Sequence, residues 1–170
     1  HYKLTGTPRG HSPAPQPMTT YRSKTASTWI ALLGGTLGLH RFYLHGPRDL
    51  LAWLHPWPTL VGLVGVLRMR ALGQDDHLAW VLIPLLGLML SLAMLTAIVY
   101  GLTPDATWDA RHNPGQPGRH TAWGPVFGVV LALLAGGITL MGTVAFSGQK
   151  FFEWQLEGAT SDQNSSRLRP

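Results

Sequence analysis

The chain has 170 residues, of which 45% are hydrophobic, 20 are glycine and only 12% are charged, about half the charged share of a typical soluble domain, and this composition favours a polytopic membrane protein. The absence of cysteine excludes disulfides, thiolate metal sites and cysteine nucleophiles. The formal net charge of +5 does not indicate a nucleic-acid partner, because Lys and Arg stand beside hydrophobic runs in twos and threes, as juxtamembrane charges do.

The first 22 residues are rich in Pro, Gly, Ser and Thr and show no apolar periodicity, which predicts a flexible N-terminal extension. Met18 stands just before the basic Arg22 and Lys24, so it is a candidate start of the native protein, with the residues before it as an upstream extension. A signal peptide starting at Met18 is the alternative, but no small-x-small cleavage site follows the apolar run.

A glycine-rich first membrane span is predicted over about residues 26–44. Gly34 and Gly38 are four residues apart, and so are Ala31 and Gly35. Two ridges of small residues therefore share one helix surface, which another backbone could approach closely.

The uncharged part of this first span ends at Leu39 and is roughly 21 Å long, against about 30 Å for a hydrocarbon core. The span is long enough if His40 and Arg41 snorkel to one interface while Phe42 and Tyr43 lie at headgroup level. Charge at this depth is expensive, so we expect Arg41 to have a partner.

A second span is predicted over residues 50–67 and ends at two arginines. Pro56 and Pro58 remove two helical donors, so a kink or break is expected near them. His55 or a bound water is the nearest group that could satisfy the freed carbonyls.

The run His40–Leu44, preceded by Gly-Gly-x-x-Gly and by Lys24-Thr25, resembles the transmembrane-two domain family. The resemblance covers residues 23–70 and implies two helices joined by a tight turn in a small bacterial inner-membrane protein. The family usually has Gly directly after Phe-Tyr-Leu, where this chain has His45. The resemblance implies no established enzyme chemistry.

The clearest membrane helix is the third span, residues 77–102, because no charged residue interrupts it. Trp80 and Tyr100 mark its two ends, and Pro84 predicts a modest bend. An extramembrane loop follows over residues 103–122 and begins with a short surface helix.

The fourth span, residues 123–147, carries small residues at a strict four-residue step, which predicts close helix crossing. These are Gly124, Gly128, Ala132 and Gly136. An interfacial tail helix anchored by Trp154 is predicted to extend to residue 157, followed by a disordered tail over residues 158–170.

The predicted fold is therefore all-α, a polytopic integral membrane protein with about four transmembrane helices arranged as two helical hairpins. Residues 23–70 form the first hairpin and residues 71–157 the second. Lys and Arg are more frequent on the terminal side of this arrangement, so both termini are expected in the cytoplasm of a bacterium, with the spans in the inner membrane.

Two readings of His40-Arg41 stay open at this point. The pair could engage a lipid phosphate or an acidic partner helix, or it could be a snorkelled helix end. A metal or haem site of His40, His45 and His55 is disfavoured because the five-residue step from His40 to His45 is not a helical ligand pair and no carboxylate lies in either span.

Catalysis finds no support in the sequence, which has neither a Gly-x-Ser-x-Gly elbow nor a glycine-rich loop before Lys-Ser or Lys-Thr. A small transporter is disfavoured because the third and fourth spans have no ionisable residue at mid-membrane depth. We therefore expect no enzymatic activity, no cofactor and no metal.

The function predicted from the sequence is helix packing, with membrane lipids and another integral membrane protein or complex, or a second copy of this chain, as partners. The alternative is a lipid, quinone or haem site near His40, Arg41, His45 and His55. The residues expected at the partner or lipid interface are His40, Arg41, Phe42, Tyr43, Gly34, Gly38, Gly124, Gly128, Ala132 and Gly136.

Overall fold

The structure, a computed structural model, describes residues 20–167. The elements in this range are α1 (Lys24–Gly34), η1 (Gly35–Leu37), α2 (Leu39–His45), α3 (Leu50–Leu54), α4 (Pro56–Leu72), α5 (His77–Leu102), α6 (Asp105–His112) and α7 (Gly124–Arg167). No strand occurs among the described residues, so the all-α class is confirmed for them. The predicted flexible extension, residues 1–22, lies almost entirely outside this range.

Three helical stretches between residues 20 and 167 are long and apolar enough to cross a membrane: Leu50–Leu72, His77–Leu102 and Gly124–Ser161. On α5, Trp80 and Tyr100 are twenty residues apart, roughly 30 Å along a helix, which matches the thickness of a hydrocarbon core. The two aromatic side chains therefore mark the two interfaces of a membrane protein.

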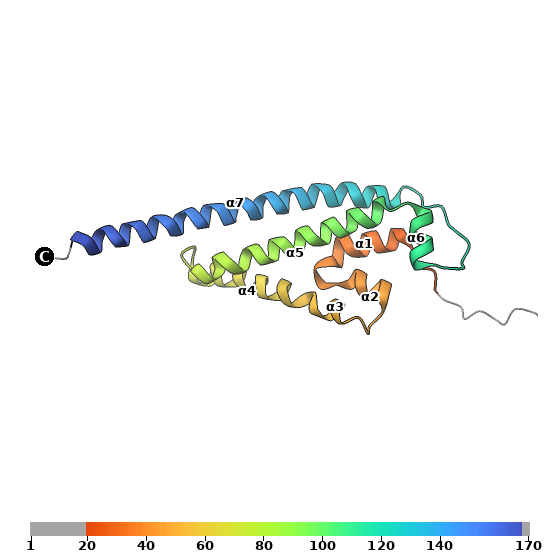
Figure 1. The fold of residues 1–170 in the computed structure, drawn as a ribbon, viewed down its shortest axis with the longest axis horizontal. Coiled ribbons are helices and arrows are strands. Elements are labelled where there is room, and N and C mark those ends of the chain that lie inside the picture. Colours follow the sequence, from red (N-terminus) through yellow and green to blue (C-terminus); the bar gives the residue numbers. More distant parts are fainter. Residues whose placement is uncertain (1–19, 168–170) are drawn as a thin grey trace, which may run out of the picture.

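Helix α5 runs between α4 and α7 and packs against both (Figure 1). Glycines allow the close approach. A Cβ atom on Gly62 of α4 would lie 2.6 Å from the Leu86 Cβ, and a Cβ atom on Gly136 of α7 would lie 2.8 Å from the Met94 Cβ. Larger side chains at these positions would push the helices apart.

The structure does not confirm a continuous first span over residues 26–44. Helix α1 stops at Gly34, and the chain turns through η1 and Gly38, which has φ +74°, before α2 returns. The two ends of this helical hairpin meet, because the backbone N–H of Ser23 donates to the Tyr43 hydroxyl over 3.1 Å and the Arg22 guanidinium donates to the Tyr43 carbonyl. The hairpin therefore enters and leaves at the same end of the bundle.

The hairpin tip lies against the C-terminal half of α5. A Cβ atom on Gly35 would lie 2.7 Å from the Ala93 Cβ, and Ala93 is seven residues before Tyr100. This places the tip roughly 10 Å inside the Tyr100 level, about a third of the hydrocarbon thickness. The Thr59 hydroxyl donates to the Thr36 carbonyl over 2.7 Å and so satisfies a backbone group that the broken helix leaves free.

Because the hairpin does not cross, the start of α1 and the C-terminal end of α7 lie at opposite ends of the long axis (Figure 1). The expectation of both termini on one side rested on four spans, and the three apolar helices do not support it. The second span breaks at His55, as predicted. Helix α7 joins the predicted fourth span and tail helix and continues through residues 158–167, a stretch that the sequence analysis expected to be disordered.

We predict that Gly38→Ala destabilises the protein more than Gly115→Ala. Both glycines have positive φ, but only at Gly38 would a Cβ atom meet neighbours, the Ala52 carbonyl oxygen at 2.8 Å and the His55 Cβ at 2.8 Å. Both changes incur about 1–2 kcal/mol for the left-handed conformation, and overpacking adds about 1–3 kcal/mol at Gly38. Thermal unfolding in detergent, followed by circular dichroism, measures the difference. Equal losses in the two variants would contradict the hairpin packing.

Candidate functional site

The partner that the sequence analysis expected for Arg41 lies in the same chain. The Arg41 Nε donates to an Asp49 carboxylate oxygen over 2.9 Å, in the turn between α2 and α3. Asp49 also caps α3 by accepting the Leu51 backbone N–H over 3.0 Å. The hydrogen bond from Arg41 is the main cause of a lowered pKa at Asp49. The guanidinium is therefore held at the end of the hairpin.

The aromatic residues after Arg41 tie the hairpin to its surroundings. Phe42 meets Trp53 of α3 edge to face, with ring centroids 5.3 Å apart, and the Trp53 indole N–H donates to the Pro47 carbonyl over 3.0 Å. Tyr43 holds the two hairpin ends together through its hydroxyl and carbonyl oxygens. These contacts give both residues a structural role at the membrane interface.

His40 on α2 is a buried histidine, at 4% exposure. Its ring centroid lies 5.6 Å from that of His55 and 5.9 Å from that of Tyr100. Among the described residues, the His40 Nδ1 has no hydrogen-bond partner. A buried polar atom without a hydrogen-bond partner destabilises the fold. A water or a small polar ligand that hydrogen-bonds to this ring would therefore bind favourably. His45 is exposed and lies 3.9 Å from Asp49 instead.

The small-residue ridges predicted for the partner interface face other helices of the same chain. On α7, a Cβ atom on Gly124 would lie 2.8 Å from Thr25 and one on Gly128 would lie 2.8 Å from Thr28, both on α1. Ala132 is completely buried, and Gly136 packs against α5. Gly34 is buried beneath Leu39 and Gly38 beneath His55, inside the hairpin. These residues serve the packing of the chain itself, and Ala132 and Gly136 also line an open groove between α5 and α7.

Helix α6 is fastened to the start of α1 by an ion pair. The Lys24 ammonium lies 2.5 Å from the Asp105 carboxylate and also donates to the Thr103 carbonyl over 3.1 Å. Asp105 accepts two further hydrogen bonds, from the Thr121 backbone N–H over 2.9 Å and from its hydroxyl over 2.5 Å. The hydrogen bond from Lys24, followed by those from Thr121, holds the pKa of Asp105 well below its usual range.

A second carboxylate, Asp109, organises the other side of α6. It accepts hydrogen bonds from the Tyr21 hydroxyl over 2.8 Å, the Asn113 amide over 2.9 Å and the Arg119 backbone N–H over 3.1 Å. The Asn113 and Tyr21 bonds lower its pKa. Trp108, fully buried, donates to the Arg22 carbonyl over 2.8 Å. Through these contacts the loop after α5 closes over the open end of the hairpin.

Metal binding has no geometric basis within residues 20–167, because no group of three His, Cys, Asp or Glu side chains there could hold an ion. His40 and His55 are the two imidazoles that the hairpin brings together. His45, the third member of the set that the sequence analysis disfavoured, lies 3.9 Å from Asp49.

Sequence reasoning missed Asp49, Tyr100, Asp105 and Asp109 as members of these networks. Asp49 carried a usable signal, since an acidic residue before an apolar helix is an N-cap and stands eight residues from Arg41. The contacts of Asp105 and Asp109 join residues about 80 to 90 positions apart, and no local pattern predicts such pairs.

We predict that Asp105→Asn lowers the free energy of unfolding at neutral pH and makes that free energy depend less on pH between pH 7 and pH 3. A carboxylate with a lowered pKa stabilises the fold above its unfolded pKa of about 4. That contribution is lost as the pH falls through the lower, folded pKa. Unfolding midpoints measured from pH 7 to pH 3 should fall less steeply in the variant. Asp75→Asn, an exposed residue, is the control and should behave like the wild type.

Comparisons with protein-family models, curated proteins and solved structures find no match for this chain. The resemblance of residues 23–70 to the transmembrane-two domain family thus rests on the His40–Leu44 motif and stays a prediction. The function is argued below from the geometry alone.

Proposed function

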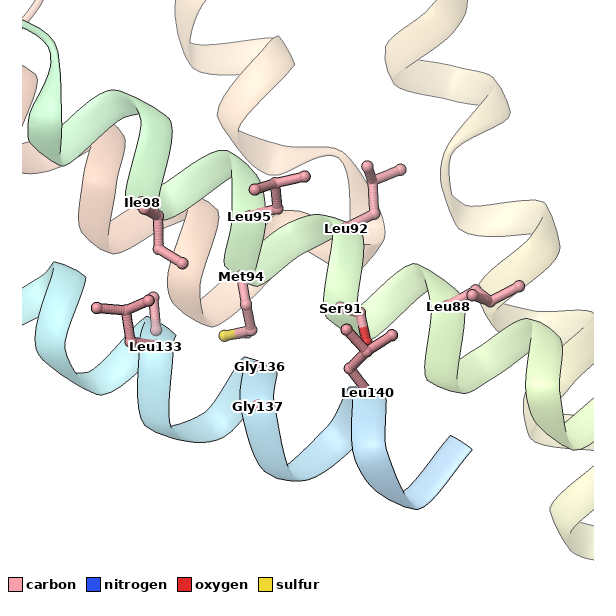
Figure 2. A pocket seen from close by; sticks show the side chains of 11 residues that line it. Leu88, Ser91, Leu92, Met94, Leu95, Ile98, Leu133, Gly136, Gly137 and Leu140 are labelled. Atoms are coloured by element: carbon pink, nitrogen blue, oxygen red, sulfur yellow. The ribbon is translucent and has the colours of Figure 1, made fainter. Parts of the chain in front are cut away.

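We propose that the chain is a non-enzymatic protein of the bacterial inner membrane that associates laterally, either as an accessory or assembly subunit of a larger membrane complex or with a second copy of itself. The observation that carries this proposal is an open apolar groove between α5 and α7, with a volume of about 420 Å³ (Figure 2). The groove is large enough to take side chains of another transmembrane helix.

The groove lies on the face of α5 that the hairpin does not cover. Ala93 faces the hairpin tip, while Leu95, two residues further and roughly 200° around the helix, lines the groove and is 54% exposed. On α7 the groove is lined by Leu133, Gly136, Gly137 and Leu140. Figure 2 shows the leucine and methionine side chains of α5 standing along one wall, with the two glycines on the facing helix.

Small residues at the groove favour a helix as the occupant. Ser91 on α5 and Gly137 on α7 leave backbone accessible, and a Cβ atom on Gly137 would have no neighbour within 4 Å. Helices associate in lipid through close van der Waals contact, which such positions allow. The other small residues, Gly128 and Gly136 among them, already serve the packing inside the chain.

We predict that Gly137→Leu abolishes the association without unfolding the protein, because leucine fills the groove and meets nothing in the free chain. Gly142→Leu is the matched control: Gly142 is equally open but does not line this groove. Gly136→Leu should instead destabilise the chain itself, because its Cβ would lie 2.8 Å from Met94. Cross-linking in native membranes followed by light scattering in mild detergent separates self-association from binding to another protein. If the association persists in Gly137→Leu, the groove is not the surface through which the protein associates.

We also propose a sidedness. The end of the bundle that holds α6 carries more cationic residues among those described than the other end does, and positive charge marks the cytoplasmic side. At the α6 end these are Arg22, Lys24, Arg41, Arg48, Arg111 and Arg119; at the other end they are Arg68, Arg70, Lys150 and Arg167. The hairpin and α6 then face the cytoplasm, and the C-terminal end of α7 lies outside.

The chain has no native cysteine, so single cysteines report this sidedness directly. We predict that Asp75→Cys, in the exposed turn before α5, reacts with a membrane-impermeant maleimide in intact cells, whereas Arg48→Cys reacts only after lysis. Labelling of Arg48→Cys in intact cells together with protection of Asp75→Cys would reverse the assignment.

A second candidate function is a ligand site at His40, where a lipid, quinone or haem group would meet Arg41, His45 and His55. The unpartnered Nδ1 of His40 beside the His55 ring favours it. We predict that His40→Phe, which keeps the ring packing with Tyr100, leaves the stability within about 1 kcal/mol if only a water is bound. A visible absorption band, or an extractable quinone or lipid that disappears in His40→Phe, would instead establish the ligand.

A further inference from the structure

We propose that the cavity between the start of α5 and the C-terminal half of α7 binds the headgroup of a zwitterionic phospholipid with a primary ammonium, phosphatidylethanolamine. The cavity has a volume of about 320 Å³ and is lined by His77, Trp80 and Val81 of α5 and by Ser147, Lys150, Phe151 and Trp154 of α7. It lies at the Trp80 level, where headgroups meet the apolar core. This site is separate from the α5–α7 groove and does not depend on the proposed association.

A buried ammonium supplies the contact for the phosphate. Lys150 is 7% exposed, and its Nζ lies 4.6 Å above the Trp80 ring and 2.6 Å from the Glu153 carboxylate. Its remaining contact, to the Gln74 carbonyl, is 3.5 Å long, at the outer limit of a hydrogen bond. A phosphate oxygen would take that donor and form a shorter, charge-assisted bond.

The groups around Lys150 suit a cation on the same ligand. Trp154 is exposed at the cavity and offers an aromatic ring to an ammonium group, whereas the Trp80 ring already holds the Lys150 ammonium. The two carboxylates beside the cavity, Glu153 next to Lys150 and Glu157 at 3.0 Å from His77, outnumber the one lysine that lines it, and Arg68 at the same end is already paired with Asp76. A purely anionic headgroup would meet this excess of negative charge, whereas a zwitterion matches both signs. The primary ammonium has N–H donors for the carboxylates, which a choline headgroup lacks.

The apolar part of the lining fits the rest of the lipid. Val81 is an exposed side chain one turn inward from His77, and Phe151 is an exposed side chain next to Lys150. The glycerol and the first methylenes of the acyl chains can lie against them while the headgroup stays at the polar rim.

The test is a lipid titration of the purified full-length protein in detergent, with dioleoyl phosphatidylethanolamine, phosphatidylcholine and phosphatidylglycerol as probes and native mass spectrometry as the readout. Phosphatidylethanolamine should bind best, and Lys150→Met and Trp154→Leu should each weaken it about fivefold. Trp154 is 60% exposed, so its replacement leaves the fold intact. Arg70→Met removes a charge at the same end outside the cavity and should bind like the wild type.

Three results would overturn the proposal. Stronger binding of phosphatidylglycerol than of phosphatidylethanolamine would mean that the site recognises negative charge alone. Equal binding of phosphatidylcholine would remove the role of the N–H donors. An equal loss in Arg70→Met and Lys150→Met would show a general effect of surface charge. Gly137→Leu, which blocks the α5–α7 groove, should leave the lipid binding unchanged, so failure of one proposal is distinguishable from failure of the other.

Discussion

A helix that stops inside a bilayer leaves amide and carbonyl groups that lipid cannot satisfy, and the architecture of this protein follows from how its first hairpin meets that constraint. Gly38 turns the chain back in a left-handed conformation, and the Thr59 hydroxyl of α4 donates a hydrogen bond to the Thr36 carbonyl. The returning helix closes on its own start through Tyr43. The hairpin is thereby wedged against α5 near one interface, and three long helices are left to cross the membrane.

The position of the hairpin divides the two faces of α5. On one face of α5, Gly35 of η1 packs against Ala93, while Gly128 of α7 packs against Thr28 of α1. On the other face no element of the described chain covers the groove beside Gly137. Because lipid provides no hydrophobic force between helices, the difference between these faces lies in how closely a backbone can approach. The inner face is closed by the chain itself, and the outer face is the one available to a neighbour.

The sequence alone was sufficient to predict the long apolar helices, but not the break within the predicted first span. Helix α5 was predictable residue for residue because its 26 residues contain no Asp, Glu, Lys or Arg and are mostly apolar. The break at Gly34–Gly38 was missed because glycines spaced by four predict a packing ridge and a helix terminus equally well. The contact of Gly38 with Ala52 and His55 distinguishes the two, and this tertiary contact cannot be read from the local sequence. The links from Asp105 to Lys24 and from Asp109 to Tyr21 were out of reach for the same reason, since these partners lie about 80 or more residues away.

The length of α7 has a mechanical consequence. A helix of 44 residues is roughly 66 Å long, more than twice the hydrocarbon thickness, and it runs without interruption from the edge of the α6 networks to beyond the Lys150 cavity. It packs along α5 from Val129 beside Gly101, through Thr143 beside Gly87, to Lys150 over the Trp80 ring. A change of ten degrees in its inclination displaces one tip relative to the other by about 11 Å. A protein that binds the side of α7 within the bilayer and tilts it would therefore move the end of the helix that lies in the aqueous phase.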